Sequence, residues 1–182
     1  MKKLMVALVA VAFAAVAQAA TFNWTASGTN ASKTFYGPDA TTIAGSIVYL
    51  FDVETIDQGA LVTAIRGGSD VTTLGAIKSA TLDTNSRLAA TQVSYGEAPT
   101  KYNFYMAIVK DDYVFVSRSV ASTAQASSIA AITYSGIKTA TLNNFGTADY
   151  SAAGWYQTVP EPTSGLLLLL GMAGLALKRK QA

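Results

Sequence analysis

YNFYMAIVKDDYVFVSRSV, residues 102–120, is the stretch that decides the fold. Its two halves, 102–109 and 113–120, are rich in β-branched and aromatic residues, which favour β-strands. The polar segment Lys110-Asp111-Asp112 between them is typical of a tight turn. The stretch therefore predicts a β-hairpin.

The second half of this hairpin also predicts which side chains share a face. Side chains alternate along a strand. Tyr113, Phe115 and Ser117 therefore fall on one face, and Val114 and Val116 fall on the other. We expect these two sets on opposite sides of a sheet.

Outside the hairpin, strand-like runs outnumber helical ones. Residues 47–53, IVYLFDV, form another strand candidate. Residues 60–66 and 122–131 are candidates for short helices, on weaker signals. Many short strands with few helical periods favour a mainly β fold, a β-sandwich-like secreted domain, and an α+β fold is the alternative.

One short segment recurs along the chain. Residues 77–82 read IKSATL and residues 137–142 read IKTATL. The similarity fits two duplicated β units, and it also fits chance in a chain rich in Thr and Ala. The sequence leaves both interpretations open.

The chain of 182 residues contains neither Cys nor His. Without Cys, no disulfide can stabilise a secreted domain and no thiol nucleophile is available. Without His, a Ser-His-Asp triad cannot form and the usual zinc ligands are missing. We therefore expect a non-enzymatic protein that needs no metal and no cofactor.

The small excess of basic over acidic residues in the chain comes from its two ends. Five of the 13 basic residues are Lys2, Lys3, Lys178, Arg179 and Lys180. The intervening body, residues 20–160, keeps 8 basic against 10 acidic side chains. Nucleic-acid binding needs a basic face on the folded part, so we expect no nucleic-acid partner.

The first 19 residues have the layout of a secretory signal peptide. Met1-Lys2-Lys3 is cationic, residues 4–16 are apolar, and Ala17 and Ala19 are small residues at the two positions that signal peptidase reads. We expect export by the Sec machinery and cleavage between Ala19 and Ala20. An uncleaved anchor is the alternative, but the apolar run is short for a bilayer of about 30 Å.

The last 24 residues, VPEPTSGLLLLLGMAGLALKRKQA, have three parts. Pro160 and Pro162 bracket Glu161, and two prolines favour an extended backbone that a processing enzyme can grip. An uncharged apolar run follows, and it is shorter than the roughly 20 residues of a full membrane span. Lys178 to Lys180 end the chain's apolar run, and a basic cluster beside a membrane segment stays cytoplasmic. The run therefore predicts a short transmembrane helix that inserts transiently. Its residues are Gly165, Leu166, Leu167, Leu168, Leu169, Leu170, Gly171, Met172, Ala173, Gly174, Leu175, Ala176 and Leu177.

This tail closely resembles the PEP-CTERM sorting signal of Gram-negative and related bacteria. Pro160-Glu161-Pro162 matches the motif, residues 165–177 match the helix, and Lys178-Arg179-Lys180 matches the basic end. The resemblance implies that an exosortase, a membrane cysteine enzyme, recognises the motif, removes the tail and passes the protein to the cell surface or extracellular matrix. It covers only the tail, and a permanent tail anchor is the alternative.

Together these features divide the chain into three parts. Residues 1–19 are the predicted signal peptide, 20–158 the mainly β secreted domain, and 159–182 the sorting signal. We expect an exported protein that the C-terminal helix anchors transiently in the inner membrane. Its expected role is structural or adhesive, at the cell surface or in the extracellular matrix.

Carboxylates are the only acid-base candidates in the body. Asp52, Glu54 and Asp57 cluster near the end of a predicted strand, and Asp111-Asp112 lies in a predicted turn. A glycoside hydrolase needs two carboxylates about 5 to 10 Å apart across a cleft, and a calcium site needs several oxygen ligands. Solvated turn residues explain Asp111-Asp112 better, and the spacing indicates no cleft. No calcium-loop pattern surrounds Asp52, Glu54 and Asp57.

Aromatic residues offer a further alternative, a carbohydrate-binding module. Trp24, Trp155 and Tyr156 are candidates for a platform that stacks on sugars, with an exopolysaccharide as the candidate ligand. Core packing is the favoured interpretation, because aromatic side chains bury large areas in β cores.

Overall fold

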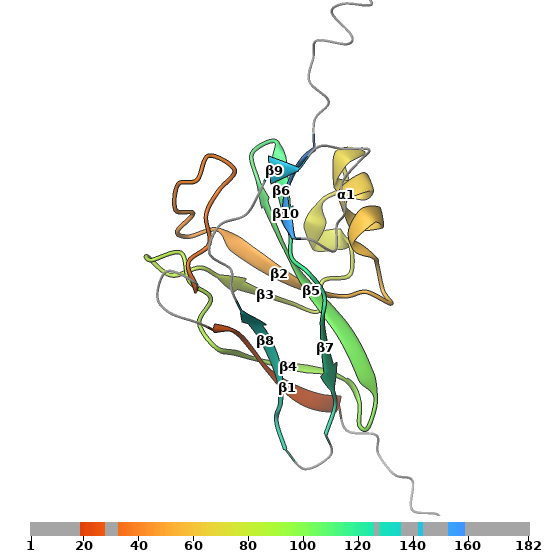
Figure 1. The fold of residues 1–182 in the computed structure, drawn as a ribbon. Helices are drawn as coiled ribbons and strands as arrows, with labels where there is room; N and C mark the ends of the chain where they lie inside the picture. The colour runs from red at the N-terminus through yellow and green to blue at the C-terminus, as the bar shows by residue number, and fades with distance from the viewer. Residues whose placement is uncertain (1–18, 28–32, 126–127, 136–141, 144–152, 159–182) are drawn as a thin grey trace, which may run out of the picture.

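The structure is a computed structural model that describes residues 19–27, 33–125, 128–135, 142–143 and 153–158. Over these residues the chain is mainly β and forms two sheets (Figure 1), as the sequence predicts. The predicted signal peptide, up to residue 18, and the predicted C-terminal helix lie outside the described residues. The elements are β1 (Ala19–Ser27), β2 (Ile47–Asp52), α1 (Gln58–Arg66), the 3-10 helix η2 (Val71–Thr73), β3 (Lys78–Thr81), β4 (Thr91–Glu97), β5 (Lys101–Lys110), β6 (Tyr113–Val116), β7 (Val120–Thr123), β8 (Ala130–Ser135), β9 (Leu142–Asn143) and β10 (Gly154–Gln157).

The two sheets differ in size, and each contains both antiparallel and parallel strand pairs. In the three-stranded sheet, β1 lies between β4 and β8, antiparallel to β4 and parallel to β8. The seven-stranded sheet has the order β3-β2-β5-β6-β10-β9, with β7 paired to the first residues of β5. The long strand β5 pairs with β2, β6 and β7, so it is the centre of the larger sheet.

The predicted hairpin is β5 and β6, which pair from Ala107–Val116 to Lys110–Tyr113. Asp111 turns the chain with a φ of 52°, a left-handed conformation that Asp tolerates better than most residues. The predicted second strand ends earlier than expected, at Val116. The Ser117 hydroxyl accepts a hydrogen bond from the Met106 N–H at 2.8 Å and donates one to the Arg118 carbonyl at 2.9 Å. The Ser117 hydroxyl thus accepts the Met106 N–H in place of a backbone carbonyl of a partner strand. Strand pairing with β5 resumes only in β7.

The larger sheet packs on both of its faces, so the domain has two apolar cores. One core lies between the sheets, where Phe104 and Met106 of β5 meet Trp24 of β1. The other lies between the larger sheet and α1, where Tyr105 packs with Leu61. The predicted alternation in the hairpin is confirmed. Phe115 belongs to the first core, with Tyr113 packed against it, whereas Val114 and Val116 belong to the second.

Of the two predicted helices, one is confirmed and one is wrong. Residues 58–66 form α1, which Asp57 caps by accepting a hydrogen bond from the Ala60 N–H at 2.8 Å. Residues 122–131 instead contain the end of β7 and the start of β8. In β8, which pairs with β1, the buried and exposed residues alternate strictly, because one face of the strand lies in the core between the sheets. This non-local pairing outweighs the helical preference of the alanines.

Of the repeated segment, only the last position, residues 82 and 142, is described in both copies. Residues 78–81 form β3, which is antiparallel to β2. Residue 142, at the end of the second copy, lies in β9, which is parallel to β10. Residues 137–141 lie outside the described residues. The duplication therefore stays a prediction.

Candidate functional site

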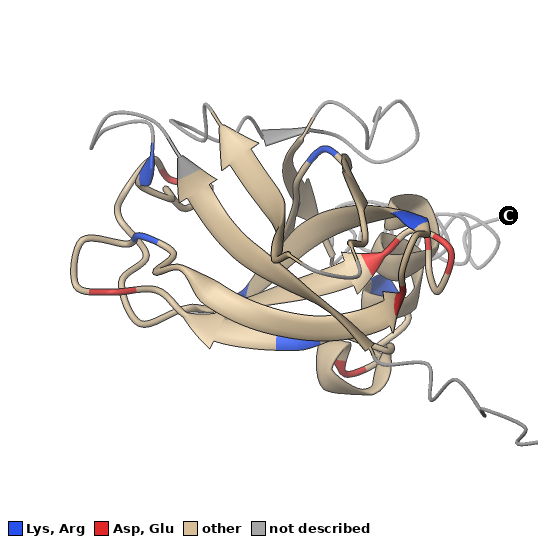
Figure 2. Cartoon of the chain, turned by 90° about the horizontal axis from the view of Figure 1, so that it is seen from below, with Lys and Arg blue, Asp and Glu red and all other residues tan. Residues whose placement is uncertain are grey.

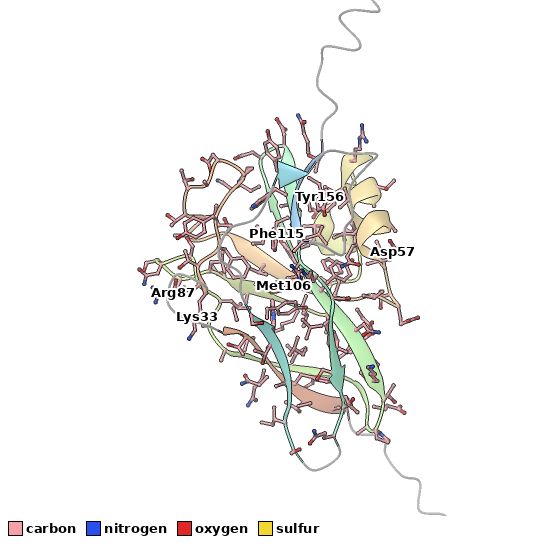
Figure 3. All side chains as sticks on the ribbon, in the orientation of Figure 1. Lys33, Asp57, Arg87, Met106, Phe115 and Tyr156 are labelled. Carbon is pink, nitrogen blue, oxygen red and sulfur yellow. The ribbon has the colours of Figure 1, made fainter. Side chains whose placement is uncertain are left out.

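The described domain ends in a strand that is built into the larger sheet. The strand β10 pairs antiparallel with β6 on one edge and parallel with β9 on the other. Its residues Trp155 and Tyr156 are both fully buried, and they point into different cores. Phe115 and Tyr156, both labelled in Figure 3, mark these two cores at the level of β6 and β10. Trp155 and Tyr156 are therefore part of the folded domain.

Trp155 also ties this end of the chain to the beginning of the domain. Its indole N–H donates a hydrogen bond to the Tyr36 carbonyl at 2.8 Å, across 119 residues of sequence. Its ring lies 5.6 Å from that of Phe115, tilted by 52°. An unpaired donor on a buried indole costs free energy, so this bond helps to hold the strand in place.

Residue Thr158, directly after β10, is held by the hairpin turn. Its N–H donates to the Asp112 carbonyl at 2.8 Å, and the residue is only 7% exposed. The chain is therefore fixed up to Thr158. The Pro160-Glu161-Pro162 motif begins two residues later, outside the described residues. Sequence reasoning missed Thr158, because nothing in a lone threonine indicates that a distant turn will hold its N–H.

The other predicted processing site lies at the opposite end of the domain. The first strand begins at Ala19, which pairs with Glu97 just before the loop that leads into β5. Ala20 is 5% exposed, within the core between the sheets. Ala17 lies outside the described residues. Glu97 and Asp112 flank opposite ends of β5, and Figure 1 shows the start of β1 and the end of the domain at β10 correspondingly far apart.

The carboxylates near the end of β2 have separate structural contacts. Asp52 is 2% exposed and accepts hydrogen bonds from the Glu54 N–H at 3.1 Å and from the Tyr95 hydroxyl at 3.0 Å. Burial raises the pKa of Tyr95 above its usual value. Asp57 caps α1, as described above, and Glu54 is exposed. Among the described residues, no group of three or more acidic side chains is placed to hold a metal ion.

The aromatic candidates lie in the core. Trp24, Trp155 and Tyr156 are fully buried, and within the described part of the chain the large exposed apolar side chains are Ile47 and Ile129. The described surface therefore presents no platform of exposed aromatic rings. Figure 2 shows basic and acidic residues interspersed along loops and strand ends, without a face of one sign in that view.

Comparison with known proteins adds one finding. Residues 158–180 match the family model of the PEP-CTERM protein-sorting motif. The matched region begins at Thr158, so the sorting signal starts inside the folded domain. It contains the motif Pro160-Glu161-Pro162, the apolar run and the basic end that the sequence singles out. The match implies an exported protein that an exosortase processes.

None of the curated proteins and none of the solved structures compared with the chain matches it. Within the ranges that the structure describes, no helix is long and apolar enough to span a membrane. The predicted membrane segment 165–177 lies outside those ranges.

Proposed function

We propose that this protein, whose residues 158–180 form a PEP-CTERM sorting motif, has a structural or adhesive role at the bacterial cell surface or in the extracellular matrix. The match to the sorting motif is the observation that carries the proposal. The protein would reach its destination after two cleavages, one between Ala19 and Ala20 and one that removes the tail. Between them the short helix at residues 165–177 would hold the precursor in the inner membrane.

The start of the fold supports the first cleavage. The strand β1 begins at Ala19, so the predicted leader ends where the folded domain begins. Export by the Sec machinery and cleavage by signal peptidase would therefore leave the strand nearly complete. The sequence pattern of residues 1–19 remains the main argument for this step.

The non-enzymatic role rests on the residue inventory and on the contacts of the carboxylates. The chain has no Cys and no His, which removes the commonest nucleophile-base pairs. Asp52 and Asp57 make contacts that stabilise the fold, as described above. A carbohydrate-binding module of the aromatic type has no support from the buried Trp24 and Trp155, so we do not propose it.

The proposal is tested by replacing Pro160, Glu161 and Pro162 together with Ala. We expect uncut precursor to accumulate in the membrane fraction. The matched control replaces Thr163 and Ser164, in the same tail, with Ala and should be processed normally. Normal processing of the motif variant would refute sorting by this motif.

Intact mass spectrometry of the protein from the cell surface or medium then gives both ends of the mature chain. A mass that starts at Ala20 and ends near Pro160, allowing for any attached group, supports both cleavages. A mass that still includes residues 166–182 would make the tail a permanent anchor instead.

A further inference from the structure

The sorting motif follows the folded domain with almost no spacer. Thr158 is buried, and its N–H is bonded to the Asp112 carbonyl in the turn between β5 and β6. Only Val159 separates it from Pro160. We call the turn Lys110–Tyr113 together with Thr158 the exit pole.

The length of the chain limits how far the motif can be from the exit pole. Two residues span at most about 7 Å even when fully extended. An enzyme that binds Pro160 to Pro162 must therefore approach the exit pole closely, as long as Thr158 stays bonded to the Asp112 carbonyl. The alternative is that β10 leaves the sheet and lengthens the free segment.

Release of β10 would disrupt both cores. Trp155 and Tyr156 are fully buried on opposite faces of the sheet and would become exposed together. The strand would also lose its pairing with β6 and β9 and the bond from Trp155 to the Tyr36 carbonyl. The folded arrangement is therefore strongly favoured while the tail is still attached.

We propose that the exosortase acts on this protein with its domain folded, and that the exit pole is a contact surface for the enzyme. This inference rests on the proposed sorting function and deepens it. The surface is polar. Lys110 and Asp111 form an ion pair at 3.6 Å, with side chains 37% and 78% exposed, and Asp112 beside them is exposed. The partner is the part of a membrane enzyme that faces the folded domain outside the membrane.

The first test changes the charge of the exit pole. Lys110→Glu and Asp112→Lys should each slow tail removal by roughly tenfold, the effect of losing one charged contact in the rate-limiting complex. The matched control is Lys101→Glu, at the other end of the same strand, which should leave the rate unchanged. The rate is measured by pulse–chase of precursor and product in cells that contain the exosortase.

A spacer separates contact from other effects of these substitutions. Four Gly and Ser residues inserted between Thr158 and Val159 lengthen the reach to about 20 Å. In this background, Lys110→Glu and Asp112→Lys should no longer change the rate relative to the spacer alone. The inference fails if the exit-pole variants lose their tail at the same rate as the Lys101→Glu control. It also fails if they slow tail removal by the same factor with the spacer as without it.

A second test asks whether β10 must leave the sheet. Tyr113 and Gln157 are cross-strand partners in β6 and β10, so Tyr113→Cys with Gln157→Cys should form a disulfide in a chain that otherwise has no Cys. The single-Cys variants are the controls for the substitutions themselves. Processing at the rate of the single variants supports action on the folded domain, whereas a block only in the disulfide-linked protein overturns it.

The motif variant distinguishes the two levels of failure. If the triple Ala variant of Pro160 to Pro162 is processed normally, the sorting function itself is wrong. If that variant accumulates as precursor while the exit-pole variants are processed normally, only the contact at the exit pole is wrong.

Discussion

The Tyr95 hydroxyl donates a hydrogen bond to Oδ2 of Asp52 at 3.0 Å, and this bond joins the two sheets. Tyr95 lies in β4 of the smaller sheet, and Asp52 ends β2 of the larger one. Because Asp52 is almost completely buried, its carboxylate depends on such donors.

Removing this donor should destabilise the domain. Tyr95→Phe leaves a buried carboxylate oxygen without its hydroxyl partner, and we expect a loss of about 1–3 kcal/mol in the free energy of unfolding. The matched control is Tyr49→Phe, a half-buried tyrosine of the neighbouring sheet. Urea unfolding measures both variants, and equal stability of the two would contradict a special role for the Asp52 contact.

Gly96 should tolerate no side chain. An added Cβ would overlap the ring of Tyr102, and the residue has a φ of 62°. The Tyr102 hydroxyl accepts a hydrogen bond from the Glu97 N–H at 2.8 Å, so the ring cannot move without losing that bond. We expect Gly96→Ala to cost about 2–4 kcal/mol.

Gly45 is the control for the backbone part of this cost. It has a φ of 77°, but an added Cβ would meet nothing within 4 Å. Gly45→Ala should therefore cost only about 1–2 kcal/mol, the penalty of the left-handed conformation. A similar loss in the two variants, measured by thermal unfolding, would show that Tyr102 moves aside at little cost.

The two tryptophans should respond differently to the same substitution. Both are fully buried, but Trp155 donates to the Tyr36 carbonyl, whereas the Trp24 indole N–H has no partner among the described residues. Trp155→Phe should cost more than Trp24→Phe by about 1 kcal/mol, the net contribution of a hydrogen bond. The comparison of their denaturant midpoints tests this, and a larger loss at Trp24 would contradict it.

The buried tyrosines predict a loss of stability in alkali. Burial raises the pKa values of Tyr105 and Tyr134 well above the usual 10.0. In the unfolded chain these residues ionise near pH 10, so their contribution to stability is complete below that pH and declines above it. Tyr105 also donates to the Ile56 carbonyl at 2.8 Å, a bond that ionisation would remove.

An alkaline titration followed by tyrosinate absorbance measures this effect. We expect one group of tyrosines to ionise gradually and another only when the domain unfolds cooperatively. Tyr105→Phe should reduce the amplitude of the cooperative step. A single gradual titration of all tyrosines, with the fold intact, would contradict the assigned burial.

The sequence predicted much of the fold where the pattern is local. The hairpin, the alternation of Phe115 and Val116, and the helix near residue 60 all follow from neighbouring residues, and the structure confirms them. The helix predicted at 122–131 is wrong because its first residues pair with β5 and its last residues pair with β1, more than 100 positions earlier. The candidate site was predicted only in part. The motif is visible in the sequence, whereas Thr158 and its partner Asp112 are not.

By itself, the sequence determined the sorting motif of this protein, because a PEP-CTERM signal is a linear pattern of neighbouring residues. Only the tertiary structure decided how the residues just before the motif are held. Trp155 and Thr158 are built into the fold through Tyr36 and Asp112, residues that are distant in sequence. Such contacts depend on how the sheets close around their cores, and no local pattern specifies which distant carbonyl a given N–H will reach.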